Sequence, residues 1–392
     1  MKPRLALLAP ALLFACTGGT TLTSPWDDVE FQAEAGRVVE RYAVLVAAHY
    51  DSTVGAAVPL RDALADLVVA PSADRLDVAR TAWLAARDQY GRTEAFRFYG
   101  GPIDGQPDDL EARINPWPLD EAYIDYVDGQ PDSGIINDPT AYPTIDRDLL
   151  IARNGAEGED SISTGWHAIE FLLWGQDMDP AGPGARPWTD FADAPDGTAA
   201  HADRRRTYLG VVADLLVTDL ETVADAWSEG QANYRAEFVA QDPKDALTKV
   251  LLGLGSLAGA ELSGERMSVA FETREQEDEH SCFSDNTHRD LLANITSIQD
   301  VWLGRAGDAA GPSLSGLVAR LDPDLDADVT ARIDAAVQAI AAIPPPFDQA
   351  IQAPDGTPAR DAVGAAIASL KDVTAGIVAV ADRLEIQLNL EE

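Results

Sequence analysis

Apolar residues recur every three to four positions along most of the chain, the spacing of helices that bury one face. These stripes cover residues 29–50, 60–68, 76–90, 209–227, 291–302, 329–340 and 373–388. Alternating β-branched residues, the pattern of a half-buried strand, are essentially missing. The pattern therefore predicts an all-α fold in which helices pack into bundles.

Two segments interrupt the helical pattern. Residues 100–160 and 177–203 are rich in Pro, Gly, Asp and Asn, and they contain only short apolar runs. Loops of this length inside a compact domain tend to line a functional surface, so we expect them to be ordered. A polar turn near 240–243 predicts the boundary between a first helical bundle, residues 27–240, and a second, residues 241–392.

One short helical run carries polar groups among apolar ones. His167 and Glu170 lie three residues apart, so one helical turn places them on the same face. Tryptophan, leucine and other apolar residues surround them, which predicts a helix buried on all sides, with Thr164 as its N-cap and Gly175 as its end. A helix N-terminus favours neutral imidazole and ionised carboxylate, the states that bind metal. In the alternative interpretation the pair only satisfies itself within a core.

A second long helix is expected over residues 246–279. Its small residues permit close approach by another helix. Glu261, Glu265 and Glu272 fall near one face, with Arg266 between them, so they could face a site. A solvated acidic stripe with Arg266 and Arg274 as counterions explains them equally well.

Further candidates flank these helices. After the second one, Asp278, His280, Ser281 and Asp285 could support a metal site, and Ser284 or Asp285 could cap the next helix, while Cys282 is expected to be a buried apolar residue.

In the first bundle the candidates are Glu94 and Glu121. Glu94 could equally form an ion pair with Arg92 or Arg97, and Glu121 could serve the first turn of a helix.

The composition argues against polyanionic partners. The chain has 66 acidic and 29 basic residues and a net charge of −37, which would repel nucleic acids and anionic lipid headgroups. A solvated surface that resists aggregation explains the excess better than a surface that collects cations.

The N-terminus has the pattern of a targeting segment. Lys2 and Arg4 precede an apolar run that ends at Ala15 and is too short to span a bilayer. Cys16 follows in a context that resembles a bacterial lipobox. We therefore expect residues 1–15 to be a lipoprotein signal peptide and 16–26 a tether lipidated at Cys16. This predicts a location in the cell envelope, in the periplasm or on the outer membrane, with membrane contact through the lipid only.

Several sequence blocks resemble the imelysin family, in particular its iron-regulated subgroup. The blocks are the Gly-x-His-x-x-Glu element at 165–170 and the segments 87–98, 113–127, 184–191, 204–209 and 265–288. The resemblance implies two helical bundles with rough internal symmetry and a site in the groove between them. It also implies that His167 and Glu170 bind a metal ion, with iron favoured and zinc possible, in a protein that serves iron uptake with other components of that system.

Three functions are compatible with these features. The first is binding of iron, or of an iron-bearing ligand, through the His-x-x-Glu site. The second is a zinc-dependent metallopeptidase, although His-Glu-x-x-His is missing and Phe171 follows Glu170, so a third zinc ligand would have to come from a distant segment. The third is a module that binds a peptide or glycan without metal.

Overall fold

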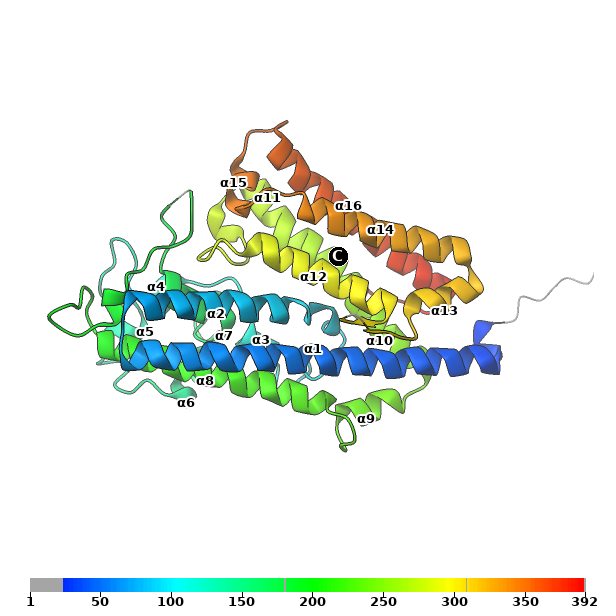
Figure 1. The fold of residues 1–392 in the computed structure, drawn as a ribbon, viewed down its shortest axis with the longest axis horizontal. Helices are drawn as coiled ribbons and strands as arrows, with labels where there is room; N and C mark the ends of the chain where they lie inside the picture. The colour runs from blue at the N-terminus through cyan, green and yellow to red at the C-terminus, as the bar shows by residue number, and fades with distance from the viewer. Residues whose placement is uncertain (1–23, 180, 308, 391–392) are drawn as a thin grey trace, which may run out of the picture.

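The computed structural model describes residues 24–179, 181–307 and 309–390, and within them it confirms the all-α prediction (Figure 1). Strands in this part are limited to an antiparallel ribbon of β1 (Arg305–Ala306) and β2 (Ala309–Ala310). The predicted signal peptide and Cys16 lie outside the described residues.

The first group of helices packs around α1 (Val29–Val69), which contacts α2 (Ala73–Gly91) and α8 (Ala202–Trp227). The short α7 (Gly165–Trp174) lies against α2 and α8. Separate helices predicted over 29–50 and 60–68 are in fact one. The helix continues through Pro59 because its buried stripe, which includes Ala57, Leu60 and Leu64, stays packed, and this packing offsets the backbone hydrogen bond that proline cannot donate.

The second group is built on one helical stretch made of α10 (Pro243–Ser256), a π-helix η4 (Leu257–Ser268) and α11 (Val269–Thr273). Against it pack α12 (Thr287–Leu303), α14 (Pro323–Ala341) and α16 (Pro358–Arg383), drawn from yellow to red in Figure 1. The predicted helix over 246–279 therefore ends early, at Thr273, and contains a π-helical segment that its sequence did not indicate.

Short elements connect these helices. They are η1 (Pro25–Asp27), η2 (Glu94–Phe96), α3 (Glu111–Ile114), α4 (Glu121–Ile124), α5 (Gly134–Asn137), α6 (Arg147–Arg153), η3 (Trp188–Phe191), α9 (Tyr234–Val239), η5 (Gln276–Asp278), α13 (Leu314–Leu321) and α15 (Phe347–Gln352). The segments expected to be ordered loops thus carry short helices, and buried ion pairs contribute to holding them. Asp125, for example, accepts hydrogen bonds from Arg186 and Arg205.

The two groups meet where α2 packs on α12 and α1 on α10. The polar turn near 240–243 lies between α9 and α10, while a domain boundary there and the internal symmetry stay predictions. By length and composition alone, α1 and α16 are long and apolar enough to cross a membrane. Both helices, however, bury one face against the rest of the fold.

Candidate functional site

The helix that carries His167 is completely buried and starts from a backbone position that requires glycine. Gly165 has a φ of +87°, and a Cβ there would lie 2.5 Å from the carbonyl oxygen of Ile114. Gly175 ends the helix as predicted, with a φ of +73°. Thr164 occupies the N-cap position, as predicted, but its hydroxyl accepts no hydrogen bond from the helix and donates to the carbonyl oxygen of Arg113 (2.9 Å).

His167 and Glu170 face each other, as their spacing predicted. Nδ1 of His167 lies 2.9 Å from Oε2 of Glu170, and both side chains have no exposed surface. The other carboxylate oxygen accepts hydrogen bonds from the amide (3.0 Å) and the hydroxyl (2.6 Å) of Ser284. Burial raises the pKa of Glu170 to about 8, against the opposing effect of these hydrogen bonds.

Arg87, on α2, occupies the other side of His167. Its Nη2 lies 3.4 Å from Nε2 of His167 and 3.1 Å from Nδ1 of His280. Nε of Arg87 donates to Asp290 on α12 (3.1 Å), and the guanidinium also donates to Asn115. Arg87 therefore connects α2, in the first group of helices, to α12, in the second, through buried side chains.

This arrangement fixes the hydrogens of both imidazoles. A guanidinium can only donate, so the nitrogens that face Arg87 are acceptors. His167 then carries its hydrogen on Nδ1 and donates it to Glu170. His280 carries its hydrogen on Nε2, because the guanidinium of Arg87 (3.1 Å) lies closer to its Nδ1 than the carboxylate of Asp290 does (3.4 Å). Burial and the charge of Arg87 hold the pKa of His167 well below its usual value, which keeps the ring neutral.

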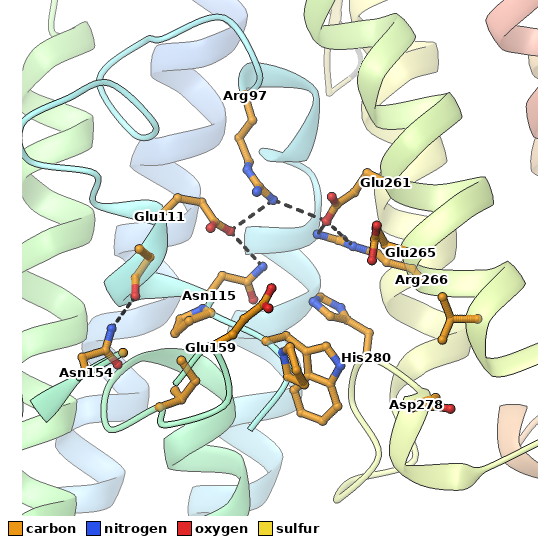
Figure 2. Close-up of a pocket in the computed structure, with 17 residues that line it drawn as sticks. Arg97, Glu111, Asn115, Asn154, Glu159, Glu261, Glu265, Arg266, Asp278 and His280 are labelled. Atoms are coloured by element: carbon orange, nitrogen blue, oxygen red, sulfur yellow. Dashed lines mark hydrogen bonds and ion pairs between the residues drawn. The ribbon is translucent and has the colours of Figure 1, made fainter. Parts of the chain in front are cut away.

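His280 joins this network to a cavity of about 650 Å³ (Figure 2). Its ring stacks edge-on with that of His167 at a centroid separation of 4.7 Å, and Trp117 covers His167 at 4.9 Å. Trp117 and His280 both line the cavity, whereas His167 lies just beneath them. Ser281 supports this segment by donating to Asp290 (2.6 Å).

The remaining walls of the cavity combine both signs of charge. Its basic residues are Arg97 and Arg266, and its acidic residues are Glu111, Glu159, Glu261, Glu265 and Asp278. Arg97 lies 3.1 Å from Glu111, while its buried Nε has no hydrogen-bond partner among the described residues. Burial raises the pKa of Glu111 to about 7.

Glu94 lies behind this wall. It accepts from Arg97 (2.6 Å) and Arg266 (3.0 Å), and Arg266 also binds Glu261 (2.6 Å). Burial would raise the pKa of Glu94, but Arg266, Arg97 and Arg87 more than offset this effect, so the pKa is lowered. The predicted ion pair with Arg97 is confirmed, and Glu94 holds the arginines of the cavity in place.

Three predicted candidates lie elsewhere. Glu121 is in the first turn of α4 and faces a small pocket with Gln176 and Asp177. Glu272 is exposed on α11. Asp285 faces Glu279 and Asp348, and neither it nor Ser284 caps α12, because Asn286 occupies that position. Cys282 is buried, as predicted.

Several residues of the site were missed by the sequence reasoning. They are Arg87, Asn115, Trp117 and Asp290, together with the role of Ser284 on Glu170. Arg87, Asn115 and Trp117 belong to the blocks 87–98 and 113–127, so the family resemblance already contained a signal for them. Asp290 had none, because it reads as a polar residue of an ordinary helix.

Comparison with known proteins agrees with the resemblance. The sequence model of the imelysin family, Peptidase_M75, matches residues 46–375. Iron-regulated protein A of Synechococcus elongatus is 26% identical over 380 residues, which cover 94% of this chain and 92% of that protein. The fold is similar to the crystal structure of a protein assigned as an iron-regulated protein A precursor from Parabacteroides distasonis, with a TM-score of 0.69, 20% identity and coverage of 90% and 95% of the two chains. The chain therefore belongs to the imelysin family.

Proposed function

We propose that this protein binds an iron-bearing ligand in the cavity beside His280 and serves iron uptake as a lipid-anchored protein of the cell envelope. The observation that carries the proposal is the contact of Arg87 with both imidazoles, because it decides which atoms are left for a ligand. Relatives named for iron regulation support iron as the metal.

A chelated ion fits this arrangement better than a bare one. Both nitrogens of His167 are engaged, and the guanidinium of Arg87 would repel a cation placed next to Nε2. His280 presents an Nε2 hydrogen, and Arg97 has a buried Nε without a partner, so both would donate to ligand oxygens. The acidic residues of the cavity offset the charge of the ferric ion itself.

In this proposal His167 and Glu170 are positioning residues. Ser284 holds Glu170 in place by hydrogen bonds, and Glu170 keeps the hydrogen of His167 on Nδ1. Arg87 contacts both His167 and His280, so it fixes the position of His280 relative to this pair. Trp117 supplies a flat apolar wall for the organic part of a chelate.

The test is equilibrium dialysis of the purified protein against radiolabelled ferric citrate, with ferrous sulfate and zinc chloride as separate arms. We expect about one ferric ion per chain and a loss of at least tenfold in affinity for His280→Ala and for the double variant His167→Ala with Glu170→Ala. Glu272→Gln, an exposed change outside the cavity, is the matched control. Failure to retain any form of iron, or equal retention by all variants, would overturn the proposal.

A zinc-dependent peptidase is the alternative that the family name raises. Within the described residues, no third His, Cys, Asp or Glu offers a donor atom within 4.8 Å of donor atoms of both His167 and Glu170. Cleavage of a peptide panel that stops with a chelator and in the double variant would favour this alternative. Binding of a peptide or glycan that needs neither metal nor these two residues would favour the metal-free module.

A further inference from the structure

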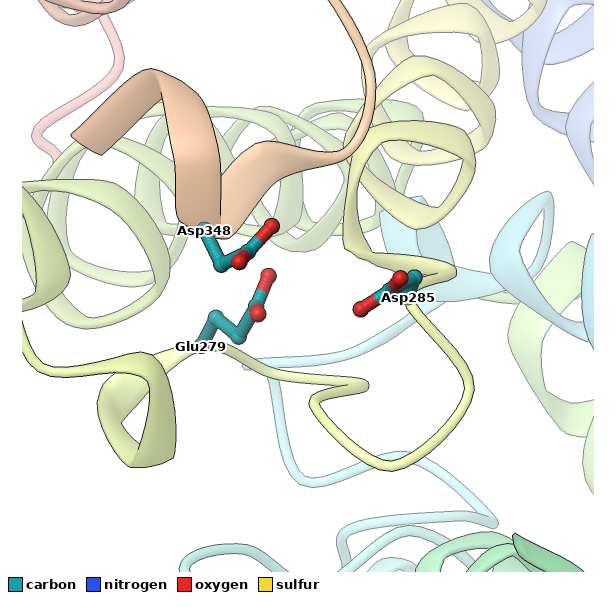
Figure 3. A group of neighbouring side chains, drawn as sticks. All are labelled: Glu279, Asp285 and Asp348. Atoms are coloured by element: carbon teal, nitrogen blue, oxygen red, sulfur yellow. The ribbon is translucent and has the colours of Figure 1, made fainter. Parts of the chain in front are cut away.

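A second cluster of acidic side chains lies on the opposite side of the segment that carries His280. Glu279 follows η5, Asp285 precedes α12, and Asp348 is in the first turn of α15. Each offers a carboxylate oxygen, and these oxygens all lie within 4.8 Å of one another. Figure 3 shows the three carboxylates turned toward a common centre.

Glu279 makes this cluster unlike an ordinary acidic patch. Its side chain has no exposed surface, and neither carboxylate oxygen has a hydrogen-bond partner among the described residues. Burial raises the pKa of Glu279 well above its usual value, and the side chain of Thr287 opposes this effect only in part. Oδ1 of Asp348, a residue that is 1% exposed, also lacks a partner. Burying a carboxylate without a partner costs free energy, so these oxygens indicate that a positively charged group binds here.

The charged groups that act most strongly on the cluster are also acidic. Burial is the largest cause of the raised pKa of both Glu279 and Asp285. Asp348 and Asp285 raise the pKa of Glu279 further, and Asp348, Asp177 and Asp179 raise that of Asp285. No arginine or lysine is among these strongest influences. Repulsion of this kind is relieved by a bound cation or by protonation.

We propose that Glu279, Asp285 and Asp348 form a calcium site, separate from the iron-ligand cavity and independent of the proposed function. Three oxygen donors without nitrogen or sulfur suit a hard cation. Calcium binds oxygens at about 2.3–2.6 Å, so two of its ligands can be up to about 4.6–5.2 Å apart, and oxygens within 4.8 Å of one another can bind the same ion. Magnesium demands near-ideal octahedral geometry and keeps several of its waters, so a buried site made of protein carboxylates suits calcium better.

Such an ion would connect α15 to the segment 279–285. That segment supplies His280 to the cavity on one side and Ser284 to Glu170 on the other. A calcium ion would therefore stabilise the position of His280 in the cavity wall without contacting the ligand in the cavity.

The test is thermal unfolding of the purified protein after treatment with a chelator, with calcium chloride or magnesium chloride added at equal ionic strength. Calcium at millimolar concentration is expected to raise the melting temperature of the wild type by several degrees, and magnesium by clearly less. Asp348→Asn and Glu279→Gln should lose most of the response. Asp324→Asn, an exposed charge loss on α14, should keep it.

The same variants separate a lost site from a damaged fold. In chelator, Asp348→Asn should melt above the wild type, because it removes an uncompensated buried charge, whereas a purely structural role would make it melt lower. Glu170→Gln should retain the calcium response even if it loses iron binding. An equal response to both ions, no response, or an unchanged response in Asp348→Asn would overturn the proposal.

Discussion

At the scale of single residues, Arg87 holds several side chains of the site in fixed positions. It is 1% exposed and its guanidinium meets two imidazoles, a carboxylate and an amide. We expect Arg87→Met to lower the free energy of unfolding by roughly 3–5 kcal/mol, because the buried carboxylate of Asp290 loses its counterion. Urea denaturation measures this loss. Adding Asp290→Asn should restore part of it, and a loss below about 1 kcal/mol would contradict the role assigned to Arg87.

Glu170 should make the stability of the protein depend on pH. Its pKa is about 8 in the folded state and 4.5 ordinarily, so between these values the folded protein binds more protons than the unfolded chain. Rising pH therefore lowers the free energy of unfolding across this window. Glu170→Gln should reduce that decline, measured as the difference between urea denaturation at pH 5 and pH 8. Identical declines in the variant and the wild type would show that Glu170 does not titrate there.

At the scale of elements, the backbone conformation of Gly165, where α7 begins, is as important for the site as the side chains of His167 and Glu170. Gly165→Ala would place a methyl group against the backbone of residue 114 at a φ that alanine avoids. We expect a loss of roughly 2–3 kcal/mol in the free energy of unfolding and weaker ligand binding. Gly210→Ala on α8, where nothing lies within 4 Å of the added Cβ, is the control and should be neutral or slightly stabilising. Equal effects of both changes would contradict this account.

The sequence predicted elements well where local spacing decides them. The apolar stripes of α12, α14 and α16 and the pair His167 and Glu170 depend only on helical periodicity. The π-helix η4 was not predictable, because the amino-acid composition of this segment does not differ from that of an ordinary helix. A π-helix has more residues per turn than an α-helix, and this changes which side chains face the cavity. Contacts such as Arg87 with Asp290, 203 residues apart, depend on the packing of distant helices and leave no local pattern.

At the scale of the whole molecule, attachment to the membrane should depend on Cys16 alone. The chain carries a net charge of −37, and removal of the segment with Lys2 and Arg4 would make the mature body more negative still, so anionic headgroups repel it. The helices α1 and α16, which are apolar enough to span a bilayer, bury their apolar faces inside the fold instead.

We therefore expect Cys16→Ser to move the protein from the membrane pellet to the soluble fraction of fractionated cells, because no other described surface attracts a bilayer. Its melting temperature and its uptake of ferric citrate should stay unchanged, since the cavity is built from residues 97–280. Ser24→Ala, a change within the tether, is the control and should leave the protein in the pellet. Retention of Cys16→Ser in the membrane would mean that another part of the chain, or a partner protein, holds it there.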